Sequence, residues 1–277
     1  MTLGAAPAWV VLVGMVCAST AHAQVLDLPS RPADAPGGGE IARDLRALDL
    51  ESREERIYAE IARGNVPEWL KQLCPVEVTH EIKGRMHRAT FWVTPDYLAV
   101  GSDDDFFRVP LSPRTAQRIA DLVAGSLPTP RMVDAIWSAA RVRLEPTPIP
   151  PSPEMTTVPV FEDHNRMVAA QRARHEEPAG VLVAGHKKDV VITATLASRP
   201  DKVAIYGWHR PDGRPIQPLY TGHTERWVDY SHGIRIVLRE MVVDGMKRDM
   251  GDVLSDDTLA PLLSDEGVVA EPRYPAH

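Results

Sequence analysis

Cysteine is scarce in this chain of 277 residues, which contains only Cys17 and Cys74. Cys17 lies in an apolar N-terminal stretch that we expect to be removed, so Cys74 would be alone in the mature protein. A single cysteine cannot form an internal disulfide bond, which excludes a disulfide-stabilised scaffold. Cys74 follows Leu73 and precedes Pro75 without a basic neighbour, a setting typical of a buried structural thiol.

Positive charge is in the minority, since 31 Lys and Arg against 38 Asp and Glu give a net charge of −7. Proteins that bind nucleic acid normally present a basic surface, so we predict no nucleic-acid partner. Beyond the N-terminal stretch no apolar run approaches ~18 residues, so we expect no integral membrane segment in the mature chain. The Gly-x-Ser-x-Gly elbow of α/β-hydrolases and the His-Glu-x-x-His helix of zinc proteases are both missing.

Residues 1–23 read as a cleavable secretory signal peptide. Residues 8–17 form an almost unbroken apolar run that is too short for a stable membrane anchor. The run is followed by Ala21-His22-Ala23, the small-x-small pattern that signal peptidase recognises. We therefore expect cleavage near Ala23 and a periplasmic or secreted mature protein.

The first half of the mature chain changes pattern several times. Residues 24–39 are rich in proline, glycine and alanine and predict a flexible tether. Residues 40–63 carry charges at helical spacing and predict one exposed amphipathic helix. Residues 76–107 predict strands, beginning with a hairpin that turns at Lys83-Gly84. Two short helices should follow, each announced by a capping residue and a proline, at Ser112-Pro113 and Thr129-Pro130.

The second half begins after a segment with six prolines, residues 145–159. We expect a helix over residues 163–175, strands from Val181 onward with a turn at Asp244-Gly245, and a last short helix over residues 252–264. Strands and helices are mixed without a regular βαβ alternation, which predicts an α+β fold with a largely antiparallel sheet and flanking short helices, preceded by the N-terminal helix. Residues 40–277 are predicted to form a single domain. The alternative is two lobes, residues 40–145 and 160–277, joined by the proline-rich segment.

Histidine is concentrated in the second half of the chain. The sequence has ten histidines, and four of the nine that follow the leader lie between residues 186 and 232. Each lies next to a glycine or close after one, as expected where the backbone turns sharply or approaches a ligand. Histidine serves most often in proton transfer near neutral pH and in zinc binding. The candidate functional site is therefore the segment from residue 186 to residue 235.

Several phrases resemble those of known proteins. The phrases GHKKDVVIT, VAIYGWH and VDYSHGIRIV, with DYLAVGSDDDFFRVPLS upstream, resemble a family of exported bacterial proteins whose activity is uncharacterised. The five residues from Ser231 to Arg235 are similar to the active-site phrase Ser-His-Gly-Cys-x-Arg of L,D-transpeptidases. Here Ile234 follows the glycine and the nucleophilic cysteine is absent, so the resemblance implies a related cell-wall fold without the transpeptidase reaction.

The first functional hypothesis is an exported hydrolase that acts on cell-wall or extracellular glycan or peptide material without a metal. Ser231 would be activated by His209 or His223, and Asp229 or Asp189 would orient the imidazole. If this stretch is a strand, the neighbours Ser231 and His232 point to opposite faces, so the partner of Ser231 should come from another phrase. The candidate catalytic residues are His209, His223, Ser231, His232 and Asp229. The candidate substrate-binding residues are Arg235, which could clamp a carboxylate, and Lys188, Trp208 and Tyr230.

The second hypothesis is zinc-assisted hydrolysis, with zinc as a possible cofactor. Three ligands from the histidine segment would leave one position open for water, and His186, Asp189 and His223 are the candidate set. The Gly207-Trp208-His209 phrase is similar to the last zinc ligand of some cell-wall dipeptidases, but the glutamate expected before it is missing.

The third hypothesis is a non-catalytic extracytoplasmic protein that binds carbohydrate or cell-wall material. Trp208, Trp227, Tyr220 and Tyr230 surround the histidines and could stack against a sugar. The same aromatic rings could equally form the core. From the sequence we favour the hydrolase hypothesis, with the non-catalytic binding protein as the alternative.

Overall fold

The hairpin predicted at Lys83-Gly84 forms the centre of the largest sheet. In the computed structural model, which describes residues 24–275, β2 (Gln72–Ile82) pairs antiparallel with β3 (Arg85–Val93). Lys83 and Gly84 have φ angles of 50° and 79°, the left-handed conformations that a two-residue hairpin turn requires. The predicted hairpin is confirmed. The predicted leader lies outside the described residues.

This sheet has seven strands and draws on both halves of the chain. Its order is β1-β2-β3-β13-β6, with β14 paired to β3 and β15 paired to β14. The further strands are β1 (Gln24–Val25), β6 (Gly125–Ser126), β13 (Val237–Leu238), β14 (Glu240–Val243) and β15 (Met246–Asp249). Because β3 pairs with β13 and β14, the two sides of the proline-rich segment contribute strands to one sheet.

A second sheet carries the histidine phrases. Its order is β11-β10-β9-β12, with β9 (Lys188–Val190), β10 (Ile205–His209), β11 (Pro215–Tyr220) and β12 (His232–Gly233). Two further pairs are β4 (Ala99–Gly101) with β5 (Phe106–Arg108), and β7 (Val142–Arg143) with β8 (Val183–Ala184). All pairings are antiparallel except those of β12 with β9 and of β7 with β8. The predicted α+β class with largely antiparallel sheets is confirmed.

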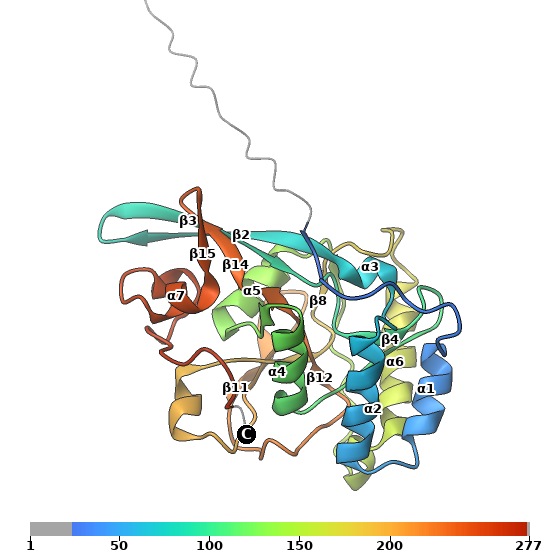
Figure 1. The fold of residues 1–277 in the computed structure, drawn as a ribbon. Helices are drawn as coiled ribbons and strands as arrows, with labels where there is room; N and C mark the ends of the chain where they lie inside the picture. The colour runs from blue at the N-terminus through green and yellow to red at the C-terminus, as the bar shows by residue number, and fades with distance from the viewer. Residues whose placement is uncertain (1–23, 276–277) are drawn as a thin grey trace, which may run out of the picture.

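The helices are short and flank the sheets. The α-helices are α1 (Gly38–Leu45), α2 (Leu50–Ala62), α3 (Glu68–Lys71), α4 (Pro113–Leu122), α5 (Pro130–Ala139), α6 (Val158–Arg172) and α7 (Met250–Ser255). The 3₁₀ turns are η1 (Pro153–Thr156), η2 (Ala194–Ser198) and η3 (Ala260–Leu262). Figure 1 shows α1, α2 and α6 side by side at one end, with the β2–β3 and β14–β15 hairpins at the other. No helix within residues 24–275 has the length and apolar character to cross a membrane.

The helix starts predicted from proline and capping residues are confirmed. The side chains of Ser112 and Thr129 accept hydrogen bonds from backbone N–H groups in the first turns of α4 and α5. The single helix predicted over residues 40–63 is wrong, because the chain forms α1 and α2 with a break between them. Asp49 lies in this break, and its side chain accepts from the N–H of Ser52, which caps α2 and starts a new helix there.

The segment predicted as a flexible tether, residues 24–39, is instead packed along the body of the protein. Leu26 is buried, and its N–H donates to the carbonyl of Lys71. Arg31 donates to the side chain of Asn65 at 2.9 Å, and Lys71 donates to the carbonyl of Pro29 at 2.7 Å. The prolines therefore shape an extended strap that polar side chains of the body hold in place.

Candidate functional site

The second sheet brings the three histidine phrases together around Lys188. In the strand ladder Lys188 is the partner of Gly207 on β10 and of His232 on β12. Paired residues of adjacent strands place their side chains on the same face of a sheet, so Lys188 and His232 lie side by side. The loop between β11 and β12 brings Asp229 to this face, where its carboxylate lies 3.8 Å from Lys188 Nζ. The carbonyl of His223 in the same loop accepts from the N–H of Val203.

Asp229 is the centre of this face. Its carboxylate accepts the Ser231 N–H at 2.8 Å, the Ser231 hydroxyl at 2.5 Å and the Trp227 indole N–H at 3.3 Å. Lys188 Nζ and His232 Nε2 each lie 3.8 Å from the same carboxylate. Burial alone would raise the pKa of Asp229, but His232 in its protonated form, the charge of Lys188 and the Ser231 donors lower it below its usual range. Asp229 is therefore a stable anion.

His232 lies on this face beside Lys188 and is fully buried. Neither of its ring nitrogens has a hydrogen-bond partner among the described residues. Burial lowers its pKa to about 4, although the nearby Asp229 acts in the opposite direction. The imidazole is therefore neutral at pH 7.

The outer rim of this face is aromatic and open to solvent. His223 stacks on Trp227, with ring centroids 5.0 Å apart and an interplanar angle of 16°, and Tyr220 meets His223 edge-on at 5.1 Å. Tyr220 is 44% exposed, and His223 and Trp227 are half-buried. Lys188, also half-buried, lies between this rim and the ring of buried Trp208, with its Nζ 5.4 Å from the ring centroid. We call Tyr220, His223, Trp227 and Lys188 the aromatic surface.

Behind the sheet, a buried ion-pair network holds the other charged residues of the histidine segment. Arg108 donates to both oxygens of Asp96, and His186 Nε2 lies 3.0 Å from the same carboxylate. Because a carboxylate accepts, Nε2 of His186 carries the proton. Burial lowers the pKa of His186 to about 4, with Asp96 opposing the shift. Burial would raise the pKa of Asp96, but Arg108 and His186 lower it.

Asp189 and Arg235 belong to the same buried region. The Tyr97 hydroxyl donates to Asp189 at 2.8 Å, and burial raises the pKa of Asp189 to about 6 despite the nearby Arg235. Arg235 donates to the carbonyls of Thr94 and Val183 at 2.9 and 2.8 Å, and its guanidinium lies over the Tyr97 ring. Arg235 is 0% exposed, so the predicted clamp on a substrate carboxylate is wrong: it ties backbone segments together.

Lys187 is buried on the opposite side of the chain from Lys188. Its Nζ donates to the carbonyl of Tyr230 at 2.6 Å and lies 3.4 Å from Nδ1 of buried His164. Burial lowers the pKa of Lys187 to about 7 and that of His164 to about 2. Nε2 of His164 lies 3.3 Å from the Thr147 hydroxyl, which is consistent with a neutral imidazole that accepts at one nitrogen and donates at the other.

His209 lies apart from Asp229, at the far end of β10. Its Nε2 is 2.8 Å from Asp134 on α5, its ring stacks on Trp137, and Tyr206 donates to the same carboxylate. Gly207 and Trp208 precede it with φ angles of 102° and 56°, and the ladder between β10 and β11 shifts register there. A positive φ is strained for a bulky residue, so Trp208 is kept in place by the packing of its buried ring.

The structure thus joins some predicted site residues and separates others. Lys188, His223, Asp229, Ser231 and His232 meet on one face of the second sheet. The predicted metal ligands do not meet: His186 faces Asp96, Asp189 faces Tyr97, and His223 lies in the aromatic surface. Within residues 24–275 no three His, Cys, Asp or Glu side chains are placed to hold a metal ion. The side chains of Trp208 and Tyr230, predicted to bind substrate, are largely enclosed, and the Tyr230 hydroxyl bonds the backbone of Ile149.

Sequence reasoning missed the partners that come from other parts of the chain. Asp96, Tyr97 and Arg108 complete the buried network, His164 contacts Lys187, and Asp134 contacts His209. The phrase that contains Asp96 and Tyr97 indicates a strand and a resemblance, but no spacing in the sequence relates it to residues 186–235.

The chain matches no protein-family model, no curated protein and no solved structure. The resemblances noted from the sequence phrases therefore stay predictions, and the functional argument rests on the geometry.

Proposed function

We propose that this protein is a non-catalytic extracytoplasmic protein that binds carbohydrate or cell-wall material through the aromatic surface. The observation that carries the proposal is the His223–Trp227 stack, with Tyr220 edge-on to it and 44% exposed. Aromatic rings with one wet edge suit sugars, because a pyranose offers both C–H groups that pack on a ring and hydroxyls that need polar partners. Lys188 and His223 supply such partners, and burial lowers the pKa of His223, which favours its neutral form.

The backbone around the aromatic surface favours a preformed site. Trp227 is oriented by its bond to Asp229, and His223 is held by the hydrogen bond from Val203 to its carbonyl. A surface whose rings are fixed before binding loses little conformational entropy when the ligand arrives.

The hydrolase alternative is less well supported by the same face. A serine nucleophile needs a base that accepts its proton, and the Ser231 hydroxyl donates to the stable anion Asp229 instead. Ser231 is 0% exposed, and His209 bonds Asp134 elsewhere. The aromatic surface, by contrast, reaches solvent as it stands.

Calorimetric titration with a soluble N-acetylglucosamine tetramer, beside sedimentation with purified cell-wall sacculi, tests the proposal. We expect Trp227→Ala and Tyr220→Ala each to weaken binding about tenfold or more, as a loss of about 1.4 kcal/mol implies. The control is Tyr58→Ala, which replaces a half-buried tyrosine of α2 whose ring lies under the guanidinium of Arg118 on α4. Absence of binding by the native protein to either probe, or equal weakening by Tyr58→Ala, would overturn the proposal.

Turnover of the same probes separates the two functions. Released fragments are measured by chromatography after prolonged incubation with the native protein. A binding protein releases none. Release that His223→Ala abolishes would replace the proposal by the hydrolase.

A further inference from the structure

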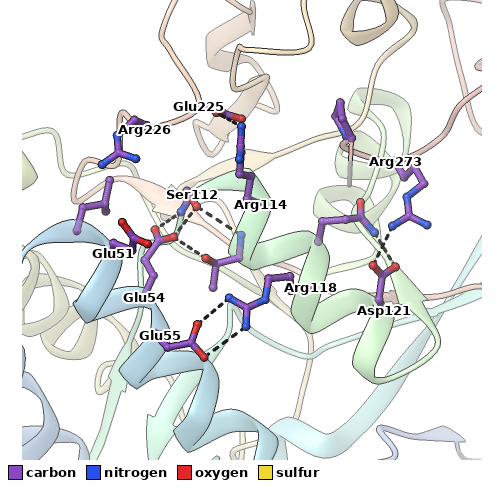
Figure 2. Close-up of a pocket in the computed structure, with 14 residues that line it drawn as sticks. Glu51, Glu54, Glu55, Ser112, Arg114, Arg118, Asp121, Glu225, Arg226 and Arg273 are labelled. Atoms are coloured by element: carbon purple, nitrogen blue, oxygen red, sulfur yellow. Dashed lines mark hydrogen bonds and ion pairs between the residues drawn. The ribbon is translucent and has the colours of Figure 1, made fainter. Parts of the chain in front are cut away.

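A charged groove is lined by residues other than those of the aromatic surface. It has a volume of about 520 Å³ and runs between α2, α4 and the loop that leads to β12, with the C-terminal segment at one end (Figure 2). A volume of this size is typical of small-molecule sites. The loop contributes Glu225 and Arg226 to this groove, whereas His223 and Trp227 of the same loop belong to the aromatic surface.

Most charges in the groove are already paired. Arg118 contacts both oxygens of Glu55, with its shorter distance 2.8 Å, and Arg273 lies 2.9 Å from Asp121. Arg114 forms a two-point ion pair with Glu225. A purely anionic ligand would have to take a guanidinium from its carboxylate and leave that carboxylate unpaired. These three ion pairs therefore do not form an anion site.

Two charged side chains at one end of the groove are free. Figure 2 shows Glu51 of α2 and Arg226 of the loop at the same end, away from Asp121 and Arg273. Neither makes a hydrogen bond or an ion pair with any described residue. An anchor for a zwitterion needs such a pair: a carboxylate for the ammonium group and a guanidinium for the carboxylate group.

The spacing of Glu51 and Glu55 along α2 provides a second carboxylate that could accept from a second ammonium group. Glu51 and Glu55 are four residues apart on one helix, so their side chains project from the same face about 5–6 Å apart at Cβ. Glu55 is the most open of the paired carboxylates, with its side chain 62% exposed, and a carboxylate can accept from a second donor besides Arg118. An extended lysine places its two ammonium groups a comparable distance apart.

The charges that line the groove balance once Glu54 is set aside. Its lining has four arginines and five carboxylates, so the groove itself is net negative by one charge. One of the five, Glu54, is occupied as an acceptor for Ser112 and Thr115 at the start of α4 and serves the fold. The remaining four carboxylates equal the four arginines, so recognition depends on the unpaired Glu51 and Arg226 and on the open Glu55.

We propose that this groove binds a free basic amino acid of the lysine type, whose carboxylate contacts Arg226, whose α-ammonium contacts Glu51 and whose side-chain ammonium contacts Glu55. The site is separate from the aromatic surface and does not depend on carbohydrate binding. The ion pairs form the walls of the groove, and the two unpaired charges, Glu51 and Arg226, determine how the ligand is oriented in it.

The test is calorimetric titration of the full chain with L-lysine and with two matched compounds. L-norleucine lacks the side-chain ammonium, and Nα-acetyl-L-lysine amide lacks the zwitterionic group. We expect L-lysine to bind and both compounds to bind at least tenfold more weakly. Arg226→Gln and Glu51→Gln should each weaken lysine binding about tenfold or more, since each removes one charge-assisted contact.

Arg248→Gln is the matched control, because Arg248 is an exposed arginine of β15 that does not line the groove. It should bind lysine as the native protein does. Glu51 and Arg226 are exposed and unpaired, so their variants should keep the native melting temperature. The proposal is overturned if L-lysine does not bind at millimolar concentration, if the blocked lysine binds equally well, or if the two groove variants bind like Arg248→Gln.

Discussion

The hydroxyl and the backbone N–H of Ser231 both donate to one oxygen of Asp229, at 2.5 and 2.8 Å. This closed arrangement fixes the chain just before β12 and keeps the Asp229 carboxylate turned toward Lys188. It also occupies the serine proton, which a nucleophile would give to a histidine. The pair is therefore better suited to holding the floor beneath the aromatic surface than to covalent catalysis.

The Ser231→Ala variant tests this assignment. Asp229 is buried and would lose one of its donors, so we expect the free energy of unfolding to fall by about 1–3 kcal/mol. Binding of the carbohydrate probe should be retained, because Ser231 does not reach the aromatic surface. Urea unfolding and titration measure the two effects. Ser198→Ala, at an exposed serine of η2, should change stability by less than about 0.5 kcal/mol. Loss of binding with unchanged stability would contradict the assignment.

Arg235 should be among the most costly residues to replace. Its guanidinium is fully buried, bonds two carbonyls from distant segments and lies 3.6 Å from Asp189. Arg235→Met would leave Asp189 without its cation, and breaking one partner of a buried pair costs about 3–5 kcal/mol. Denaturant unfolding beside Arg248→Met, a surface change, measures the difference. Equal stability of the two variants would show that Arg235 does not hold the fold together.

The buried histidines predict a loss of stability in mild acid. The folded-state pKa is about 4 for His186 and His232 and about 2 for His164, against an unfolded value of about 6.5. Below pH 6.5 the unfolded chain therefore binds more protons than the folded one, and stability falls as the pH decreases toward 4. Asp189 acts in the opposite direction, because its folded pKa of about 6 is raised, so it offsets roughly one of the three histidines.

Urea unfolding at pH 7, 6 and 5 measures this slope, which is about 1.4 kcal/mol per pH unit for each proton bound. His232→Leu gives the matched comparison, because His232 has no hydrogen bond to lose among the described residues. Its slope between pH 6 and 5 should be shallower by about one proton. A profile with the native slope in this variant would mean that His232 is not the neutral, buried group described here.

Local features of the fold could be predicted because local chemistry determines them. The turn at Lys83-Gly84 and the starts of α4 and α5 depend on residues that are neighbours in sequence. The histidine phrases also indicate where polar side chains gather, on β9, β12 and the loop before β12. What the sequence could not show is which face of those strands is closed.

The buried ion-pair partners could not be predicted, because their contacts join residues that are distant in sequence. Asp96 and Arg108 lie far from His186 in sequence, and their pairing is visible only once β4 and β5 are placed. The sequence around a buried arginine such as Arg235 does not differ from that around an exposed one, so the sequence alone allows the interpretation as a substrate clamp. The packing of residues 24–39 could not be predicted, because the side chains of Asn65 and Lys71, outside this segment, hold its backbone carbonyls.

Lys187 predicts an unusual gain of stability in mild alkali. Its ammonium is 1% exposed, its Nζ donates to the Tyr230 carbonyl, and burial lowers its folded pKa to about 7 from an unfolded value near 10.5. Above pH 7 the folded chain therefore releases this proton while the unfolded chain keeps it, so stability rises with pH, at up to about 1.4 kcal/mol per unit. Burial raises the pKa of Cys74, which acts oppositely near pH 9, so the measurement belongs between pH 7 and 8.5.

The Lys187→Met variant completes this test, because methionine fills similar space without a charge. Urea unfolding of the native protein should show a rising free energy between pH 7 and 8.5, and the variant a flat one. Lys202→Met, at a half-exposed lysine paired with Asp201, should keep the native rise. If the native protein is equally stable at both pH values, Lys187 keeps its proton in the folded state. The buried ammonium would then be stabilised by Asp96 and Asp229 more strongly than burial penalises it, and the interior around Tyr230 would be more polar than its contacts indicate.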